Sequence, residues 1–455
     1  MFHFEPDVSR RGFLETSVAL GAFMLPQLTS EARSAQKKPR SKARAKSVIV
    51  LLQEGGMSHL ESWDPKPEAP AEIRGRFKTI ATSNPQLTIG EHMPRLARQA
   101  HLYNVVRSTY LDNKRNDHSP GLHWIITGYD NQAAGVSLMK ENKDPSVGSI
   151  ISHELGSLNS QGLPNFVTIP SRKQLGGRVN FSGAVHLGAR YEAFESGAVP
   201  AKASGQYVLP SGLTLPKHFP ISRLQDRRTL LKTLDELKRQ QDTSAQLQEL
   251  SQYQQHAFNL LLGQRGQKAF DINREPADVR ARYGNSNMGQ GTLLARRLVE
   301  AGVTYVLVNY SKNNSWDTHK DNFNRLQKTL LPPMDQAVSA LLEDLDERGM
   351  LDDVLVLLTG EMGRTPIINK NAGRDHWSGL FSLMIAGGGL TRGQILGSSS
   401  KHAESPKDRP VHFNEILATV YEQLGIDPHL AIPDRFDRPV RIMPEAEPVQ
   451  ELIRG

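Results

Sequence analysis

The chain has 455 residues, enough for one large domain or two modest ones with a substantial buried core. It contains no cysteine, which excludes disulfides, thiolate metal sites and any mechanism that needs a cysteine nucleophile or a cysteine-derived formylglycine. The net charge is +7, but nine basic and four acidic residues within 1–46 account for +5 of it, so the sequence predicts no nucleic-acid-binding face.

The N-terminal segment has the layout of a twin-arginine export signal. Arg10 and Arg11 are adjacent, and a weakly apolar run follows at residues 18–28. We therefore predict a signal over 1–32, a basic linker over 33–46, recognition by the twin-arginine export machinery, and a periplasmic or extracellular mature protein. The alternative is an ordinary amphipathic N-terminal helix.

Short runs of apolar and β-branched residues recur along the rest of the chain, which is typical of buried parallel strands. They lie at residues 47–53, 102–107, 165–169, 303–310, 354–359 and 381–386. Segments with helical spacing separate them, at residues 94–100, 147–155, 289–301, 322–348 and 414–424. This alternation predicts one α/β domain over 47–455, with a mostly parallel central sheet and helices on both faces.

Residues 221–270 differ from this pattern because they are rich in Gln, Leu, Lys and Glu at helical spacing. We predict a helical insertion of two long helices beside the sheet, with the Gln-rich part exposed to solvent. No run of about 18 uncharged apolar residues occurs anywhere in the chain, so we expect no membrane-spanning helix.

Polar motifs follow several of the predicted strands, at the edge where open α/β sheets bind their ligands. The first motif contains Glu54 and His59 beside Gly55 and Gly56, and either polar side chain could bind a metal. A plain turn from strand to loop is an equal alternative.

A second motif, at residues 117–124, predicts a short helix because a proline lies near its start and Gly128 ends it. The helix N-terminus offers free backbone amides and a positive dipole end to an oxyanion. His118 or Ser119 there could act as a nucleophile or contact the anion. The alternative is that Ser119 only caps the helix, with Asp117 as its competitor.

Three later motifs supply carboxylates and imidazoles from loops at strand ends. They contain Asp317 and His319, then Glu361 with Arg364, then His376. Carboxylates mixed with imidazoles suit Zn²⁺, Mn²⁺ or another divalent cation rather than Ca²⁺ alone. Singly, each motif has a structural explanation, but their order on this topology favours a metal site.

The order of these motifs resembles the alkaline phosphatase superfamily, and more closely an uncharacterised bacterial family of exported sulfatase-like proteins with twin-arginine signals. The resemblance covers nearly the whole chain and is specific for membership rather than for activity. It rests on residues 55–59, 63–67, 71–82, 118–121, 316–319, 360–366, 373–377 and 407–410.

The resemblance implies roles for individual positions. His118 stands where a sulfatase carries its modified nucleophile, while Asp317, His319 and His376 resemble the metal ligands of the phosphatase branch, with Glu361 nearby. The resemblance favours a single divalent metal centre over a pair of centres, with zinc as a candidate. A second centre lacks support because Met362 replaces a ligand and Gln53-Glu54 replaces an aspartate.

Two functions follow as hypotheses. The first is an exported metal-dependent hydrolase of sulfate or phosphate esters, acting on a small anionic ester or on a sulfated or phosphorylated glycan, in which His118 or Ser119 attacks or positions water and Arg364 balances charge on the leaving oxyanion. The second is a non-catalytic binding or assembly protein that keeps the fold and the anion pocket. The absence of the usual nucleophile motif, with Gly121 and Leu122 in place of its Ser and Arg, and the presence of Met362 favour the second hypothesis. Retention of Asp317, His319, Glu361 and His376 favours the first.

Overall fold

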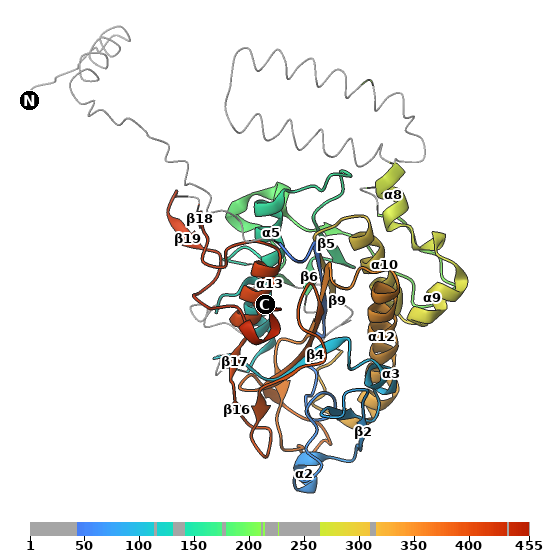
Figure 1. The fold of residues 1–455 in the computed structure, drawn as a ribbon, viewed down its shortest axis with the longest axis vertical. Helices are drawn as coiled ribbons and strands as arrows, with labels where there is room; N and C mark the ends of the chain where they lie inside the picture. The colour runs from blue at the N-terminus through green and yellow to red at the C-terminus, as the bar shows by residue number, and fades with distance from the viewer. Residues whose placement is uncertain are drawn as a thin grey trace, which may run out of the picture. The chain divides into compact units, whose positions relative to one another are not determined.

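The computed structural model describes residues 43–112, 116–130, 142–174, 179–210, 213, 226, 264–309, 315–434 and 436–454 (Figure 1). Their centre is a nine-stranded sheet. In spatial order its strands are β14 (Ile395–Leu396), β4 (Tyr103–Tyr110), β13 (Phe381–Gly387), β10 (Val354–Thr359), β1 (Ser47–Leu52), β9 (Tyr305–Asn309), β5 (Phe166–Ile169) and β8 (Phe194–Glu195), with β17 (Val411–His412) paired to β4.

The predicted fold class is confirmed, because most neighbouring strands in this sheet run parallel. One strand departs from the expectation of a buried parallel strand: β13 is antiparallel to both β10 and β4. The connection between β10 and β13, described in full, contains the hairpin of β11 (Gly363–Arg364) and β12 (His376–Trp377) and no helix. Without a crossover helix the chain returns in the opposite direction.

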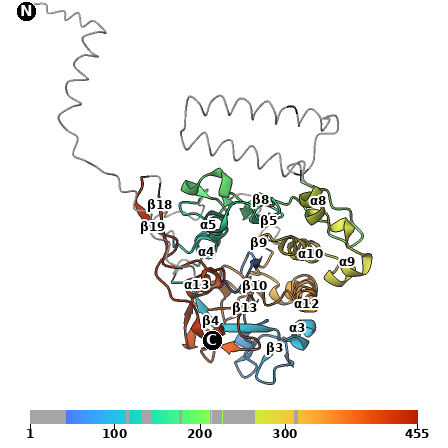
Figure 2. The ribbon, with the colours of Figure 1, turned by 45° about the horizontal axis from the view of Figure 1, so that its top comes forward.

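Both faces of the sheet are covered by helices, as Figure 2 shows. On β1, Val48, Val50 and Leu52 belong to one apolar core and Ile49 and Leu51 to the other, the alternation expected of a strand buried on both sides. The first core includes residues of α4 (His118–Thr127), α5 (Val147–Leu155) and α13 (Phe413–Gln423). The second includes residues of α3 (Pro94–Arg98), α10 (Asn287–Glu300) and α12 (Leu331–Glu347).

The predicted helix over 322–348 is divided in the structure. It consists of α11 (Asn322–Arg325), the π-helical turn η6 (Leu326–Leu330) and α12. Pro332 and Pro333 lie in the first turn of α12 and lack the N–H groups that a continuous α-helix would use. The prolines therefore explain why the helical register changes just before α12.

Smaller elements surround this framework. The remaining helices are α2 (Ala71–Arg74), α8 (Gln264–Phe270), α9 (Ala277–Tyr283), η2 (Val185–Leu187), η3 (Ala189–Tyr191), η5 (Ile272–Arg274) and η7 (Gln450–Leu452). The remaining strands form two-stranded pairs: β2 (Thr79–Ala81) with β3 (Thr88–Gly90), β6 (Lys173–Gln174) with β7 (Val179–Asn180), β15 (Ser398–Ser399) with β16 (Pro406–Asp408), and β18 (Ala431–Pro433) with β19 (Pro439–Arg441).

The predicted signal over 1–32 and most of the linker over 33–46 lie outside the described residues. The last linker residues are held by the domain, since the Arg44 and Ala45 amides donate to the Gln423 carbonyl and the Lys46 amide donates to the Asp353 carbonyl. Of the predicted insertion over 221–270, only residue 226 and α8 are described, so the pair of long helices stays a prediction.

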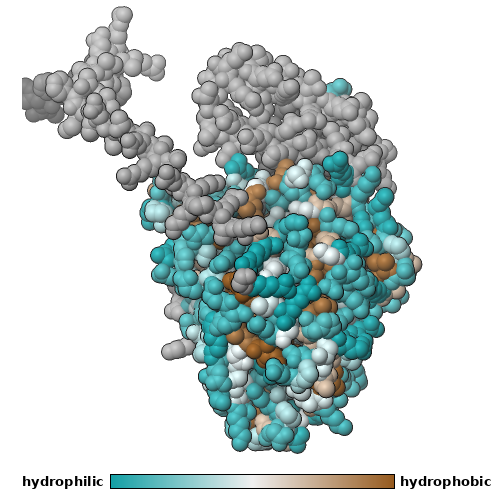
Figure 3. Space-filling view, viewed as in Figure 1, coloured by the Kyte–Doolittle hydropathy of each residue, from teal (hydrophilic) through white to brown (hydrophobic). Residues whose placement is uncertain are grey.

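The face visible in Figure 3 is mainly hydrophilic over the described residues, with scattered apolar spots. Among described residues, the large apolar side chains that are exposed are Val185, Val208, Ile367 and Phe436. No helix within the described ranges combines the length and the apolar character needed to cross a membrane.

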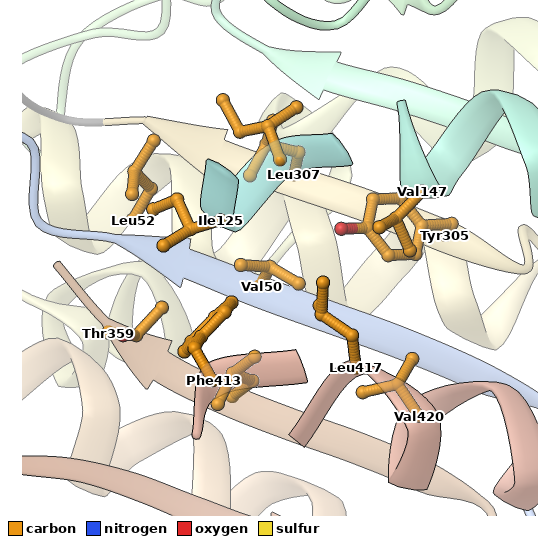
Figure 4. Close-up of a pocket in the computed structure, with 12 residues that line it drawn as sticks. Val50, Leu52, Ile125, Val147, Tyr305, Leu307, Thr359, Phe413, Leu417 and Val420 are labelled. Carbon is orange, nitrogen blue, oxygen red and sulfur yellow. The ribbon is translucent and has the colours of Figure 1, made fainter. Parts of the chain in front are cut away.

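The region under α4 is apolar on the sheet side and polar at the sheet edge. Figure 4 shows a gap there lined by side chains such as Val50, Leu307 and Ile125, with Thr359 at the end of β10. Leu52 pairs with Thr359 and with Asn309, so β1, β10 and β9 end at the same level. The loops that follow these strands therefore meet at one edge.

Candidate active site

The loop after β9, the connection between β10 and β13 and the start of α4 meet at this carboxyl edge of the sheet. The loop after β9 carries Asp317 and His319, and the loop after β10 carries Glu361. His376 precedes β13, whose reversed direction places its first residue at the same edge. His118 opens α4, which follows β4 along the chain. The topology thus explains why these distant residues come together.

Asp317 lies at the centre of the group. Its Oδ1 atom is 3.0 Å from Nε2 of His319 and 3.2 Å from Nε2 of His376. Those two imidazole nitrogens are themselves 2.9 Å apart. The other carboxylate oxygen, Oδ2, lies 3.3 Å from Nε2 of His118.

The hydrogen bonds on the far side of each ring determine which nitrogen carries the proton. Nδ1 of His376 is 2.6 Å from the Asn116 carbonyl oxygen, which can only accept, so this nitrogen donates. Asn116 has φ of 48°, a left-handed conformation that asparagine tolerates better than most residues. Nδ1 of His319 is 2.5 Å from Oδ1 of Asp375, and this hydrogen bond lowers the pKa of the Asp375 carboxyl.

His118 follows the same arrangement. Its Nδ1 lies 2.6 Å from Oε1 of Glu361, whose carboxylate also accepts from the Gly55 amide at 2.8 and 3.1 Å. Within the described residues, Nε2 of His118 has no hydrogen bond of good geometry despite its 3.3 Å approach to Asp317. When neutral, all three imidazoles therefore direct an Nε2 lone pair toward the Asp317 carboxylate.

This convergence fits a divalent cation. Three Nε2 lone pairs and a carboxylate are all acceptors, and acceptors that face one another are stable only with a proton or a cation between them. Two ligand atoms bound at about 2.1 Å to one ion are about 3.0–3.4 Å apart, close to the separations around Oδ1. Suitable atoms of His118, Asp317 and His376 all lie within 4.8 Å of one another. Second nitrogens that donate to carbonyl or carboxylate groups are typical of metal-binding histidines.

The charges at the site stabilise one another strongly. Burial alone would raise the pKa of Asp317, but the close imidazoles of His118 and His376 and the charge of Arg364 hold it well below its usual range. Burial alone would lower the pKa of His118, but Asp317 and Glu361 raise it to about 10. In the absence of a cation, a proton on His118 therefore supplies the compensating positive charge.

Arg364 has a different position from the one its predicted role requires. Its side chain is fully buried, and Nη2 donates to Oδ1 of Asp317 at 2.7 Å. Its nitrogens also donate to the backbone carbonyls of Gly55, Gly56, Trp316 and Arg374. Because its nitrogens donate to these partners, the Arg364 guanidinium fixes Asp317 and links three loops. This geometry does not support a role for Arg364 at a leaving oxyanion.

The start of α4 also differs from the expectation. Asp117, not Ser119, is the N-cap residue, and its side chain makes no capping hydrogen bond. Ser119 is buried within the first turn. The reason is that the helix begins at His118, two residues earlier than a Ser119 cap would require.

The remaining candidates lie near the group without joining its ligand atoms. Glu54 is buried and accepts a hydrogen bond of 2.7 Å from Asn309 at the end of β9. Glu361 contacts His118 rather than Asp317. His59 is buried farther along the loop, where Nε2 lies 3.3 Å from the Ala403 carbonyl oxygen.

Sequence reasoning did not assign roles to the groups that hold the rings: the Asp375 carboxylate, the Asn116 carbonyl and the Gly55 amide. Asp375 could have been found from its motif, because it directly precedes His376. At the two backbone groups, the glycine and the asparagine are consistent with unusual backbone conformations, but these identities do not indicate the hydrogen-bond partners, which only the fold reveals.

The family described as "Protein of unknown function (DUF1501)" matches residues 45–453. No curated protein matches the chain.

Several solved structures are similar at low identity. They include the PsFucS1 sulfatase from Pseudoalteromonas sp. (12% identity, 88% of this chain and 71% of that chain covered, TM-score 0.39). They also include a protein in the alkaline phosphatase superfamily from Vibrio parahaemolyticus (11%, 86% and 69%, TM-score 0.37) and a TAB5 alkaline phosphatase mutant with magnesium bound (9%, 85% and 99%, TM-score 0.37). At these values the similar structures carry no weight for the chemistry, which rests on the geometry above.

Proposed function

The chain belongs to the DUF1501 family, and we propose that it is an exported, metal-dependent hydrolase of sulfate or phosphate esters with a sulfatase-like site. One observation carries this proposal: three imidazoles, each held by a hydrogen bond at Nδ1, direct Nε2 toward the buried carboxylate of Asp317. A scaffold built only for stability would pair these acceptors with donors.

Asp317, His319 and His376 would hold the ion. Two imidazoles and one carboxylate suit Zn²⁺ and also other divalent transition ions, with zinc as the first candidate. When bound, such an ion would polarise the ester oxygen and offset negative charge on the anion. Arg364 keeps Asp317 in place from below.

His118 is the residue proposed to act on the substrate. It lies at the start of α4, next to the amides and the positive dipole end that favour an anion. The two carboxylates keep its ring protonated, with a pKa of about 10. With a dication beside Asp317 that electrostatic field is offset, which favours the neutral ring needed by a base or nucleophile. Ser119, buried in the same turn, is the second candidate.

Export places the substrate outside the cytoplasm. The adjacent Arg10 and Arg11 and the apolar run after them support the twin-arginine route. A small anionic ester or a sulfated or phosphorylated glycan would fit the proposed chemistry. Replacing both arginines with lysine should leave the precursor in the cytoplasm, as shown by cell fractionation, and normal export of that variant would refute this route.

A non-catalytic binding protein is the second candidate. Arg364 is sealed beneath Asp317, and the buried Met362 occupies the position after Glu361, so two groups expected of a full hydrolase site do not face a substrate. These observations favour a protein that keeps the fold without turnover.

Elemental analysis of protein purified from its native export route separates the two. We expect about one divalent metal per chain in the wild type, none in Asp317→Asn, and hydrolysis of an aryl sulfate or an aryl phosphate by the wild type alone. A wild-type protein with no bound metal and no turnover on either ester would overturn the hydrolase proposal.

A further inference from the structure

Glu361 contacts the imidazole of His118 more closely than it contacts any of the proposed metal ligands. The Oε1–Nδ1 distance is 2.6 Å, in the range of a charge-assisted hydrogen bond. Glu361 itself is fully buried at the end of β10. Its carboxylate therefore has a defined partner before any ligand is present.

Two glycines shape this contact. Gly55 has φ of +112°, and a methyl group there would lie 2.4 Å from the Asp317 amide nitrogen, so only glycine lets its own amide donate to both oxygens of Glu361. A methyl group at Gly121 would lie 3.1 Å from the Glu361 carbonyl oxygen and 3.3 Å from its Cγ. The missing side chain at Gly121 thus lets α4 approach until His118 reaches Glu361.

Both carboxylate oxygens of Glu361 already accept hydrogen bonds from the protein. Oε1 accepts from His118 and Gly55, and Oε2 accepts from Gly55. The compact set of ligand atoms lies elsewhere, at Oδ1 of Asp317 with His319 and His376. His118 approaches the opposite oxygen, Oδ2, at 3.3 Å, although a ligand atom of its ring also lies within 4.8 Å of ligand atoms of Asp317 and His376.

We propose that Glu361 is a positioning residue that fixes the ring of His118, and that His118 is a general base beside a metal centre formed by Asp317, His319 and His376. This inference rests on the proposed function and assigns separate roles in it to Glu361 and His118. Glu361 then acts through His118 and is not a ligand.

The hydrogen bond to Glu361 keeps the proton on Nδ1 and makes Nε2 the basic nitrogen. Nε2 of His118 takes a proton from the attacking water while the water oxygen bonds to sulfur or phosphorus. The bond from that atom to the ester oxygen breaks, and the released oxygen takes the proton back from His118. Atoms and charge balance without a further reactant.

The two carboxylate–histidine pairs of the site provide a matched comparison. Glu361 holds His118, and Asp375 holds His319, by the same kind of hydrogen bond. Glu361→Gln should keep the wild-type zinc content but lower turnover of p-nitrophenyl phosphate or p-nitrophenyl sulfate on the order of a hundredfold or more. Asp375→Asn should instead lower zinc affinity by about 10–100-fold. His118→Ala should retain zinc and lose turnover.

A third measurement depends on neither zinc nor turnover. A short, charged Nδ1–H···O hydrogen bond should give a proton resonance far downfield in protein labelled with ¹⁵N-histidine. It should be present in the wild type and absent from Glu361→Gln and His118→Ala.

The failures can be told apart. Loss of zinc from Glu361→Gln or His118→Ala, to the extent seen in Asp317→Asn, would make that residue a ligand and overturn the inference. Turnover of Glu361→Gln within about twofold of wild type would overturn it as well. If the wild type binds no zinc and hydrolyses no ester, the proposed function fails, and the downfield resonance alone decides whether Glu361 positions His118.

Discussion

Two buried polar clusters in this protein are built on opposite rules. Between α9, α10 and α12, Arg296 forms ion pairs of 2.8 Å with Glu275 and 3.0 Å with Asp344, so positive groups meet negative ones. At the carboxyl edge, Nε2 of His319 lies 2.9 Å from Nε2 of His376, so acceptor meets acceptor. The first cluster balances its charges internally, although Nε and Nη2 of Arg296 make no hydrogen bond of good geometry within the described residues. The second cluster needs a proton or a cation between its acceptors.

The largest expected effect comes from breaking the charge-balanced cluster. Arg296→Met removes one buried counter-charge from Asp344 and Glu275, which keep Arg348 and Arg297 as partners. The free energy of unfolding should therefore fall by at most about 3–5 kcal/mol, the range for breaking a buried ion pair. Zinc content should stay at the wild-type value because the site is untouched. Urea denaturation followed by circular dichroism measures the loss.

Arg282→Met is the matched control, because Arg282 pairs with the largely exposed Glu343 and Glu347. Its loss should be at most about 1 kcal/mol. Equal losses for the two variants would mean that burial does not distinguish these ion pairs.

The second prediction concerns His59, an imidazole near the site that belongs to the scaffold. Burial lowers its pKa to about 4, although Asp64 and Glu61 oppose the shift and Arg374 adds to it. The unfolded chain binds this proton first, so the stabilisation is complete above pH of about 6.5 and is lost as the pH falls toward 4. The loss should reach about 3 kcal/mol.

Urea denaturation at several pH values between 4 and 7 tests this prediction. Because carboxyl groups titrate in the same range, the informative quantity is the difference between the wild type and His59→Gln. That difference should shrink as the pH falls. A difference that is constant with pH would show that His59 takes up its proton in the folded state as readily as in the unfolded one.

The positions of the main strands and their burial in the core were predictable from the sequence. The direction of β13 was not. A run such as 381–386 has the same apolar pattern whether its neighbours are parallel or antiparallel, so periodicity identified β13 without its orientation. The break before α12 was visible in principle at Pro332 and Pro333. Helical spacing on both sides of the prolines concealed it.

The candidate site was predictable in its residue types and only partly in its arrangement. The predicted parallel topology brings Asp317 and His319 to the carboxyl edge, and the reversed direction of β13 adds His376 there. The separation of Glu361 from this group depends on the Gly55 amide and on the close approach at Gly121. Such contacts depend on the exact position of the backbone, and the spacing of residues in the sequence does not determine that position.

The third prediction concerns completion of the open cluster. A metal that binds only the folded state stabilises it by about 2.7 kcal/mol when the free metal is at 100 times its dissociation constant. Zinc should therefore raise the melting temperature of the wild type but not of His376→Gln. Calorimetry with and without chelator measures the shift, and an equal shift in both proteins would locate the metal elsewhere.

The smallest expected effect tests the contact between α4 and Glu361. Gly121→Ala gains about 1 kcal/mol of helix propensity, but the added methyl group lies 3.1 Å from the Glu361 carbonyl oxygen and must displace it. Crowding of this kind costs about 1–3 kcal/mol, so we expect a net loss near 1 kcal/mol. Because the displacement moves Glu361 away from His118, the downfield Nδ1 proton should disappear even though the fold survives. Ser119→Ala, which adds no bulk to the same turn, should keep that resonance. If Gly121→Ala also keeps it, α4 does not set the distance between His118 and Glu361, and the edge tolerates more bulk than the contacts indicate.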